Sequence, residues 1–140
     1  MEEDNRCKYC GKKIAKNKQF CDGKCSNKFR HNQSYNDFLE NSEKYCKGNY
    51  TPKNFKDKFL VEQDHKCAIC GNPDTWNGQE LHLVIDHIDG DASNNRRENL
   101  RMICPNCDSQ LPTFKSRNKH STRRNYWKEK IYRDLGKEMP

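Results

Sequence analysis

The sequence predicts a small α+β protein whose fold is stabilised by bound metal rather than by a large apolar core. Only 31% of its 140 residues are hydrophobic, while 34% are charged, so little apolar surface is available to bury. Nine cysteines, eight of them in close pairs, can replace part of a core with metal sites. Short strand patterns in the middle of the chain are flanked by helical ones.

The spacing of the cysteines predicts metal binding. The pairs are Cys7/Cys10, Cys21/Cys25, Cys67/Cys70 and Cys104/Cys107, and Cys46 is left over. The first ten residues, MEEDNRCKYC, hold no apolar signal-peptide stretch, so we expect a cytoplasmic protein with reduced thiols. Four thiolates around one ion form a closed tetrahedral site, which is structural because no position stays open for water. We therefore predict two structural zinc sites, and the odd cysteine count argues against the alternative of disulfides.

Four segments follow one another along the chain. We expect a four-cysteine zinc module at 1–32, a helical connector at 33–64, a core with strands at 65–118 and a basic C-terminal helix at 119–140. In the connector, apolar residues at helical spacing follow Ser34, which we expect to cap a helix that ends at Gly48. No apolar run approaches the length that spans a membrane, so we expect no membrane partner.

The core segment contains a turn, two strand patterns and a helix start. Asn77-Gly78 is a strong hairpin turn. Apolar and polar residues alternate over 81–86, as in a half-buried strand, and a second strand is expected at 100–103. A helix is expected to begin at 105–107, and Pro112 limits its length.

Residues 85–90 read IDHIDG, which places carboxylates around one histidine in a chain of net charge +7. Together with CAICG, WNG, ENLRMICPNCD and the residues that follow, this stretch resembles the zinc-containing HNH endonucleases, especially small ones from phages and mobile elements. The resemblance covers about residues 65–118. It implies a ββα-metal (His-Me finger) core, two antiparallel strands and a helix around one divalent ion, in a bacterial or phage-infected host cell. The first segment resembles four-cysteine zinc modules found in front of such nucleases.

The resemblance implies a role for four residues. His87 matches the general base, Asp86 a metal ligand, and Asn99 the residue that holds the loop between the strands. Asp108 stands where the family usually has His or Asn, and a pair of carboxylates favours Mg²⁺ or Mn²⁺. Asp108 has the alternative role of favouring a helix N-terminus through the dipole. Neighbours on a strand point to opposite faces, so Asp86 and His87 reach one site only where the strand bends or ends.

Basic residues near this site predict contacts with the phosphates of double-stranded DNA. The candidates are Arg96, Arg97, Lys115, Arg117, Lys119, Arg123 and Arg124. The alternative for such a run is a solvated helix face.

The sequence therefore predicts a metal-dependent DNA endonuclease that hydrolyses phosphodiester bonds. Two other classes stay open: a zinc-stabilised DNA-binding protein whose HNH site is degenerate because of Asp108, and a structural RNA-binding zinc module. Nothing in the sequence specifies the target sequence or the oligomeric state.

Overall fold

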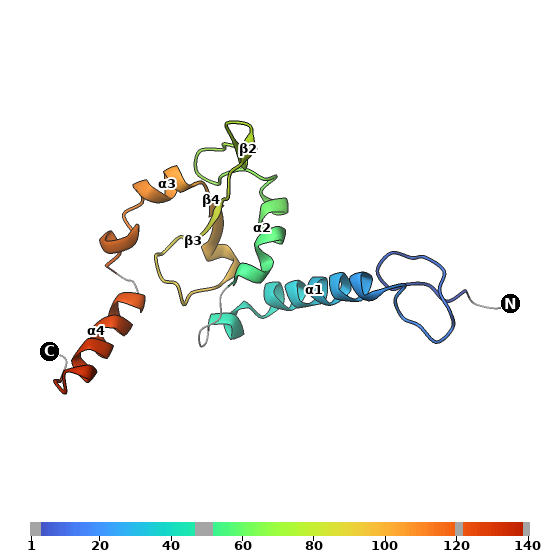
Figure 1. Ribbon diagram of the computed structural model, residues 1–140, viewed down its shortest axis with the longest axis horizontal. Helices are drawn as coiled ribbons and strands as arrows, with labels where there is room; N and C mark the ends of the chain where they lie inside the picture. The colour runs from blue at the N-terminus through green and yellow to red at the C-terminus, as the bar shows by residue number, and fades with distance from the viewer. Residues whose placement is uncertain (1–3, 47–51, 120–121, 139–140) are drawn as a thin grey trace. The chain divides into compact units, whose positions relative to one another are not determined.

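A computed structural model describes residues 4–46, 52–119 and 122–138, without the side chains of Ser116 and of residues 122–127. The chain forms two compact units, Met1–Asn41 and Ser42–Pro140 (Figure 1). Each unit carries one of the two four-cysteine sets. None of the helices in the described residues is both long enough and apolar enough to cross a membrane.

The first unit consists of a looped segment and helix α1 (Gly23–Glu40). Asp22 caps this helix, since its Oδ1 accepts a hydrogen bond of 2.7 Å from the backbone N–H of Cys25. The cap predicted at Ser34 is wrong, because Asp22 starts the helix earlier and no breaker interrupts it before Asn41. Gly48, the predicted helix end, lies outside the described residues. Cys25 thus lies in the first turn of α1, where the helix holds its thiol in place.

The second unit begins with short helices that cover one part of its core. These are the 3₁₀ helix η1 (Ser42–Cys46), the 3₁₀ helix η2 (Pro52–Phe55) and helix α2 (Lys56–Glu62). Phe55 and Phe59 are buried, as expected for apolar residues at helical spacing, and α2 contacts strand β4 (Leu100–Ile103).

A tight hairpin follows, formed by strands β1 (Thr75–Trp76) and β2 (Gln79–Glu80). The two residues between them, Asn77 and Gly78, have φ of 56° and 75°. Positive φ at both central positions is the requirement that favours Asn-Gly in two-residue hairpin loops, so the predicted turn is confirmed.

The centre of the second unit is a two-stranded antiparallel sheet covered by a helix. Strand β3 (Val84–His87) pairs with β4, and helix α3 (Pro105–Gln110) contacts β3 (Figure 1). The strand predicted from residue 81 begins three residues later, at Val84, where pairing with Ile103 of β4 starts. The backbone N–H of Leu81 donates to the carbonyl of Asp74 instead of to β4. Leu83, Met102 and Ile103 are fully buried and form the core. The α+β class is confirmed, with a ββα arrangement at residues 84–110.

Three further elements complete the second unit. The 3₁₀ helix η3 (Arg97–Asn99) leads into β4, the 3₁₀ helix η4 (Lys115–Arg117) follows α3, and helix α4 (Thr122–Asp134) comes last. Gly136, with φ of 62°, follows the end of α4.

Candidate functional site

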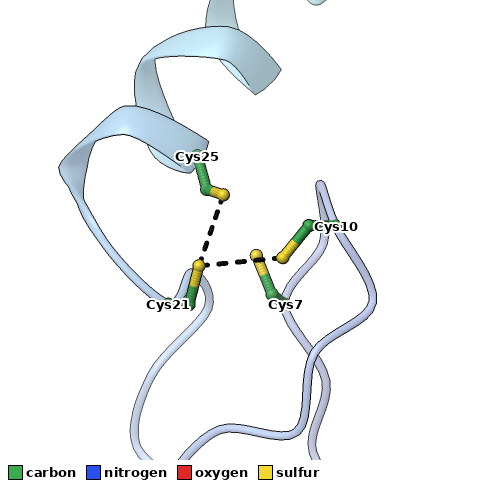
Figure 2. A group of neighbouring side chains, drawn as sticks. All are labelled: Cys7, Cys10, Cys21 and Cys25. Carbon is green, nitrogen blue, oxygen red and sulfur yellow. Dashed lines mark hydrogen bonds between the residues drawn. The ribbon is translucent and has the colours of Figure 1, made fainter.

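The four cysteines of the first unit surround a common point (Figure 2). Sγ of Cys21 lies 3.7 Å from Sγ of Cys10 and 3.3 Å from Sγ of Cys25. Tetrahedral zinc with Zn–S bonds of about 2.3 Å requires sulfur atoms about 3.8 Å apart. The four sulfur atoms all lie within 4.8 Å of one another, so the set fits a closed tetrahedral ion.

The second cysteine set joins the segment before the β1–β2 hairpin to the end of β4. Cys67, Cys70, Cys104 and Cys107 also lie within 4.8 Å of one another, and the Sγ atoms of Cys70 and Cys104 are 3.8 Å apart. Backbone N–H groups face the sulfurs: that of Cys104 donates to Cys67 at 3.2 Å, and that of Cys107 to Cys104 at 3.4 Å. All nine cysteines are free thiols, and the eight in the two sets have sulfur spacings that fit metal binding.

The thiols of these sets differ in acidity. The backbone N–H of Cys10 is the main cause that lowers the pKa of Cys7 to about 6. Burial raises the pKa of Cys67, but backbone N–H donors, those of Cys70 and Cys104 foremost, outweigh it and lower the pKa to about 6. Burial, together with the neighbouring thiols, raises the pKa of Cys107 to about 12. One cysteine in each set thus has a lowered pKa, and a bound divalent cation would favour the ionised form of all four.

His87 lies at the end of β3, where a buried amide holds its ring. Nε2 of His87 is 2.8 Å from Oδ1 of Asn95, which is 1% exposed. Nδ2 of Asn95 in turn donates to the backbone carbonyl of Tyr45 at 2.9 Å. His87 Nδ1 has no hydrogen-bond partner among the described residues. The ring is therefore anchored on one edge and open on the other.

Asp86 and Asp108 lie close enough to influence each other. Burial raises the pKa of Asp108, the negative charge of Asp86 raises it further, and Lys115 opposes both. Asp86 is 8% exposed and accepts a hydrogen bond of 2.7 Å from Nε of Arg101, its partner across the β3–β4 pair. The two carboxylates thus repel each other at the junction of β3 and α3, a position that suits a cation.

A cavity of about 160 Å³ lies at the end of β3, where the neighbours Asp86 and His87 both reach it. It is lined by Ile85, Asp86, His87, Gly90, Ala92, Thr113 and Asn118. Strand β3 ends at His87 and the chain turns at Gly90, where φ is 76°. A Cβ on Gly90 would lie 2.6 Å from Cγ2 of Thr113, so only glycine fits there. Asp86 and His87 therefore border one hollow although they are neighbours on a strand.

The two carboxylates and the imidazole do not by themselves enclose an ion. Among the described residues, the groups of three or more ligand side chains with all ligand atoms within 4.8 Å are the two cysteine sets. Mg²⁺ commonly takes one or two carboxylates and completes its shell with water and phosphate oxygens. An open pair such as Asp86 and Asp108 fits that mode of binding.

Asn99 fastens the loop between β3 and β4. Its Nδ2 donates to Oδ1 of Asp89 at 2.9 Å and to the carbonyl of Asn94 at 2.8 Å, and its Oδ1 accepts from the N–H of Asp89 at 3.1 Å. Burial raises the pKa of Asp89, but hydrogen bonds from Asn94, the Asp91 backbone and Asn99 outweigh this and lower it. The loop that follows His87 is held by this network.

The basic candidates have different surroundings. Arg96 bonds Glu43 at 2.8 Å, while Arg97 pairs with Glu62 and lies 4.6 Å from the centre of the Phe59 ring. Lys115 and Arg117 lie over Phe114, Arg117 also donates to the carbonyl of Ser109, and Lys119 is exposed. Arg123 and Arg124 belong to α4, but their side chains lie outside the described part.

Sequence reasoning did not single out three residues that contact the site. They are Asn95, Arg101 and Asn118, whose Nδ2 donates to the carbonyl of Gly90 at 2.7 Å. Arg101 follows from the strand register once Asp86 is chosen, because directly opposed residues interact. Asn95 and Asn118 act through backbone carbonyls far away in sequence, for which no sequence pattern exists.

Paired strands, a following helix, a strand-end histidine and two acids form a ββα arrangement at this site. Residues 77–105 match the model of a family described as HNH endonuclease, a range that includes Asp86, His87 and Asn99 and ends before Asp108. The chain is also 38% identical over 65 residues to H-N-H endonuclease F-TflIV of Escherichia phage T5, which covers 45% of this chain and 28% of that protein. The chain thus spans less than a third of the length of this relative. No solved structure matches the chain. The resemblance to HNH endonucleases is confirmed for the central segment.

Proposed function

We propose that the chain is a metal-dependent DNA endonuclease of the HNH type that hydrolyses phosphodiester bonds. The observation that carries the proposal is the cavity bordered by both Asp86 and His87, with the carboxyl group of Asp108 close enough to Asp86 for its pKa to respond. A histidine with an open ring nitrogen beside a pair of acids suits proton removal from water next to a divalent cation.

In this proposal each residue has one task. His87 accepts the proton of the attacking water, and Asp86 with Asp108 would hold Mg²⁺ or Mn²⁺. When bound, such an ion stabilises the negative charge that develops on the phosphate and the leaving oxygen. Asn99 keeps the loop after His87 in place. The two cysteine sets would each hold one structural zinc, supported by sulfur spacings that fit Zn–S bonds of about 2.3 Å.

We further propose that double-stranded DNA lies along the basic residues near the site. The net charge of +7 favours a polyanion, and the exposed Lys119 follows η4 beside the cavity residue Asn118. Lys115 and Arg117 would act with it, together with Arg96, Arg97, Arg123 and Arg124. Arg97 already has Glu62 and Phe59 as partners, so we expect its share to be the smallest. The site of action would be the cytoplasm of a bacterial or phage-infected cell.

The test is nicking of supercoiled plasmid in Mg²⁺ or Mn²⁺ by the full chain and by His87→Ala. We expect the variant to lose activity while keeping its zinc content and circular dichroism spectrum. His82→Ala is the matched control, because the His82 side chain is 76% exposed and lies outside the cavity lining. Undiminished nicking by well-purified His87→Ala would remove the assigned base.

A DNA-binding protein with a degenerate site is the second candidate, and one contact favours it. Arg101 already pairs with Asp86, which reduces the net negative charge that a cation would meet. This candidate predicts duplex binding without cleavage, and a gain of Mg²⁺-dependent nicking in Asp108→His. A structural RNA-binding module would instead be indicated by stronger competition from structured RNA than from duplex DNA.

A further inference from the structure

Asn95 is the most deeply buried polar side chain at the site, and it has a partner at each end. It is 1% exposed, its Oδ1 faces Nε2 of His87 at 2.8 Å, and its Nδ2 donates to the carbonyl of Tyr45 at 2.9 Å. Tyr45 belongs to η1, fifty residues earlier in the chain. A buried amide with both ends satisfied keeps a single orientation, because turning it would leave polar atoms unpaired.

The chemistry of the three partners fixes where the imidazole proton lies. A backbone carbonyl only accepts hydrogen bonds, so the amide nitrogen of Asn95 has to face Tyr45. The amide oxygen then faces His87, and an oxygen of this kind accepts, so Nε2 has to carry the proton. In the neutral ring Nδ1 is consequently the nitrogen with the lone pair.

We propose that Asn95 is a positioning residue that holds His87 in the tautomer with the proton on Nε2, and that the carbonyl of Tyr45 anchors it. This rests on the proposed function only for its catalytic consequence. The base would then be oriented from η1, which lies outside the segment that matches the HNH family. The connector thus contributes to the site and is more than a spacer.

The direct test reads the tautomer by nuclear magnetic resonance. The full chain keeps the zinc in its cysteine sets, and no Mg²⁺, Mn²⁺ or DNA is added. Its histidine rings are labelled with ¹⁵N and measured at about pH 8, where an ordinary imidazole is neutral. His87→Gln assigns the signals of His87 by their disappearance. We expect a protonated Nε2 and an unprotonated Nδ1, with a ring N–H signal that exchanges slowly with water. A protonated Nδ1 in the wild type would overturn the proposal.

Substitution separates positioning from mere support of the fold. In Asn95→Ala we expect the slowly exchanging ring signal to be lost and kcat for nicking to fall about tenfold to hundredfold, with KM little changed. If Asn95→Ala does not fold, Asn95→Ser takes its place, with the same two measurements. A folded variant that keeps both the ring signal and wild-type kcat would refute the positioning role. Because the ring signal is measured without DNA, it tests the positioning role of Asn95 independently of whether the wild type cleaves DNA.

Discussion

Replacing Asn99 by alanine should lower the free energy of unfolding, because its side chain holds the loop between β3 and β4. The buried side chain makes three hydrogen bonds, and one of them goes to the carboxylate of Asp89. A neutral hydrogen bond contributes a net 0.5 to 1.5 kcal/mol, roughly, and one to a charged group about 1.5 to 3 kcal/mol. The sum runs from about 2.5 to 6 kcal/mol, and because Asp89 regains water we expect a loss near the lower end, about 3 kcal/mol.

The assay is urea unfolding of the full chain with zinc kept bound. At a slope of about 2 kcal/mol per molar urea, a loss of about 3 kcal/mol moves the midpoint of the second unit down by about 1.5 M. Asn54→Ala is the matched control, since Asn54 is exposed and its side chain has no hydrogen bond among the described residues. We expect its effect to stay within about 0.5 kcal/mol.

Amide hydrogen exchange gives the same prediction a local readout. The N–H of Asp89 donates to the Asn99 side chain, whereas the N–H of Ile88 donates to the Asn99 backbone carbonyl at 2.9 Å, which alanine retains. Asn99→Ala should therefore speed exchange at Asp89 much more than at Ile88. Equal protection at both amides, or an unfolding midpoint like that of Asn54→Ala, would refute the tether.

Further predictions concern the metals, the core and the DNA. Cys104→Ser should reduce bound zinc from two ions per chain to one by elemental analysis; two retained ions would contradict the second site. Asp108→Asn should raise the Mg²⁺ concentration needed for half-maximal nicking, and an unchanged requirement would remove Asp108 as a ligand. Ile103→Ala, in the buried core, should lower the free energy of unfolding by about 2 to 5 kcal/mol, against about 0.5 kcal/mol for the exposed Val61→Ala, and similar losses would mean that the core lies elsewhere. Lys119→Gln should lower the slope of log affinity against log salt by about 1, and an unchanged slope would place Lys119 off the DNA.

The elements that sequence predicted well are those set by a few neighbouring residues. The Asn77-Gly78 turn needs positive φ at two adjacent positions, and the start of α3 needs a proline in its first turn. Both requirements are local, so a few adjacent residues are enough to predict each feature. The separate helix start predicted at Ser34 was wrong because Asp22 and Ser34 are both good caps, and the helix that begins after Asp22 continues through Ser34.

For the site, too, residues that are neighbours in the chain could be predicted and contacts between distant residues could not. Asp86 and His87 are adjacent in the chain, and their meeting at one cavity required only that β3 end there. The hydrogen bond from Asn95 to Tyr45 joins residues fifty positions apart through a backbone carbonyl, which any residue type supplies. A contact of this kind leaves no trace in composition or spacing, and only the folded chain reveals it.

Asp86 is buried and Asp108 half-buried, and the charges around these two acids bear on the proposed metal site. Burial and the negative charge of Asp86 raise the pKa of Asp108, and Lys115 offsets this only in part. Arg101 contacts Oδ2 of Asp86 and leaves Oδ1 without a contact from it. A divalent cation on the remaining oxygens would bring two positive charges to the point where the two negative ones meet, which neither basic side chain does. In the proposed function this repulsion would favour metal binding, and the contact between β3 and α3 would keep both carboxylates near the ion.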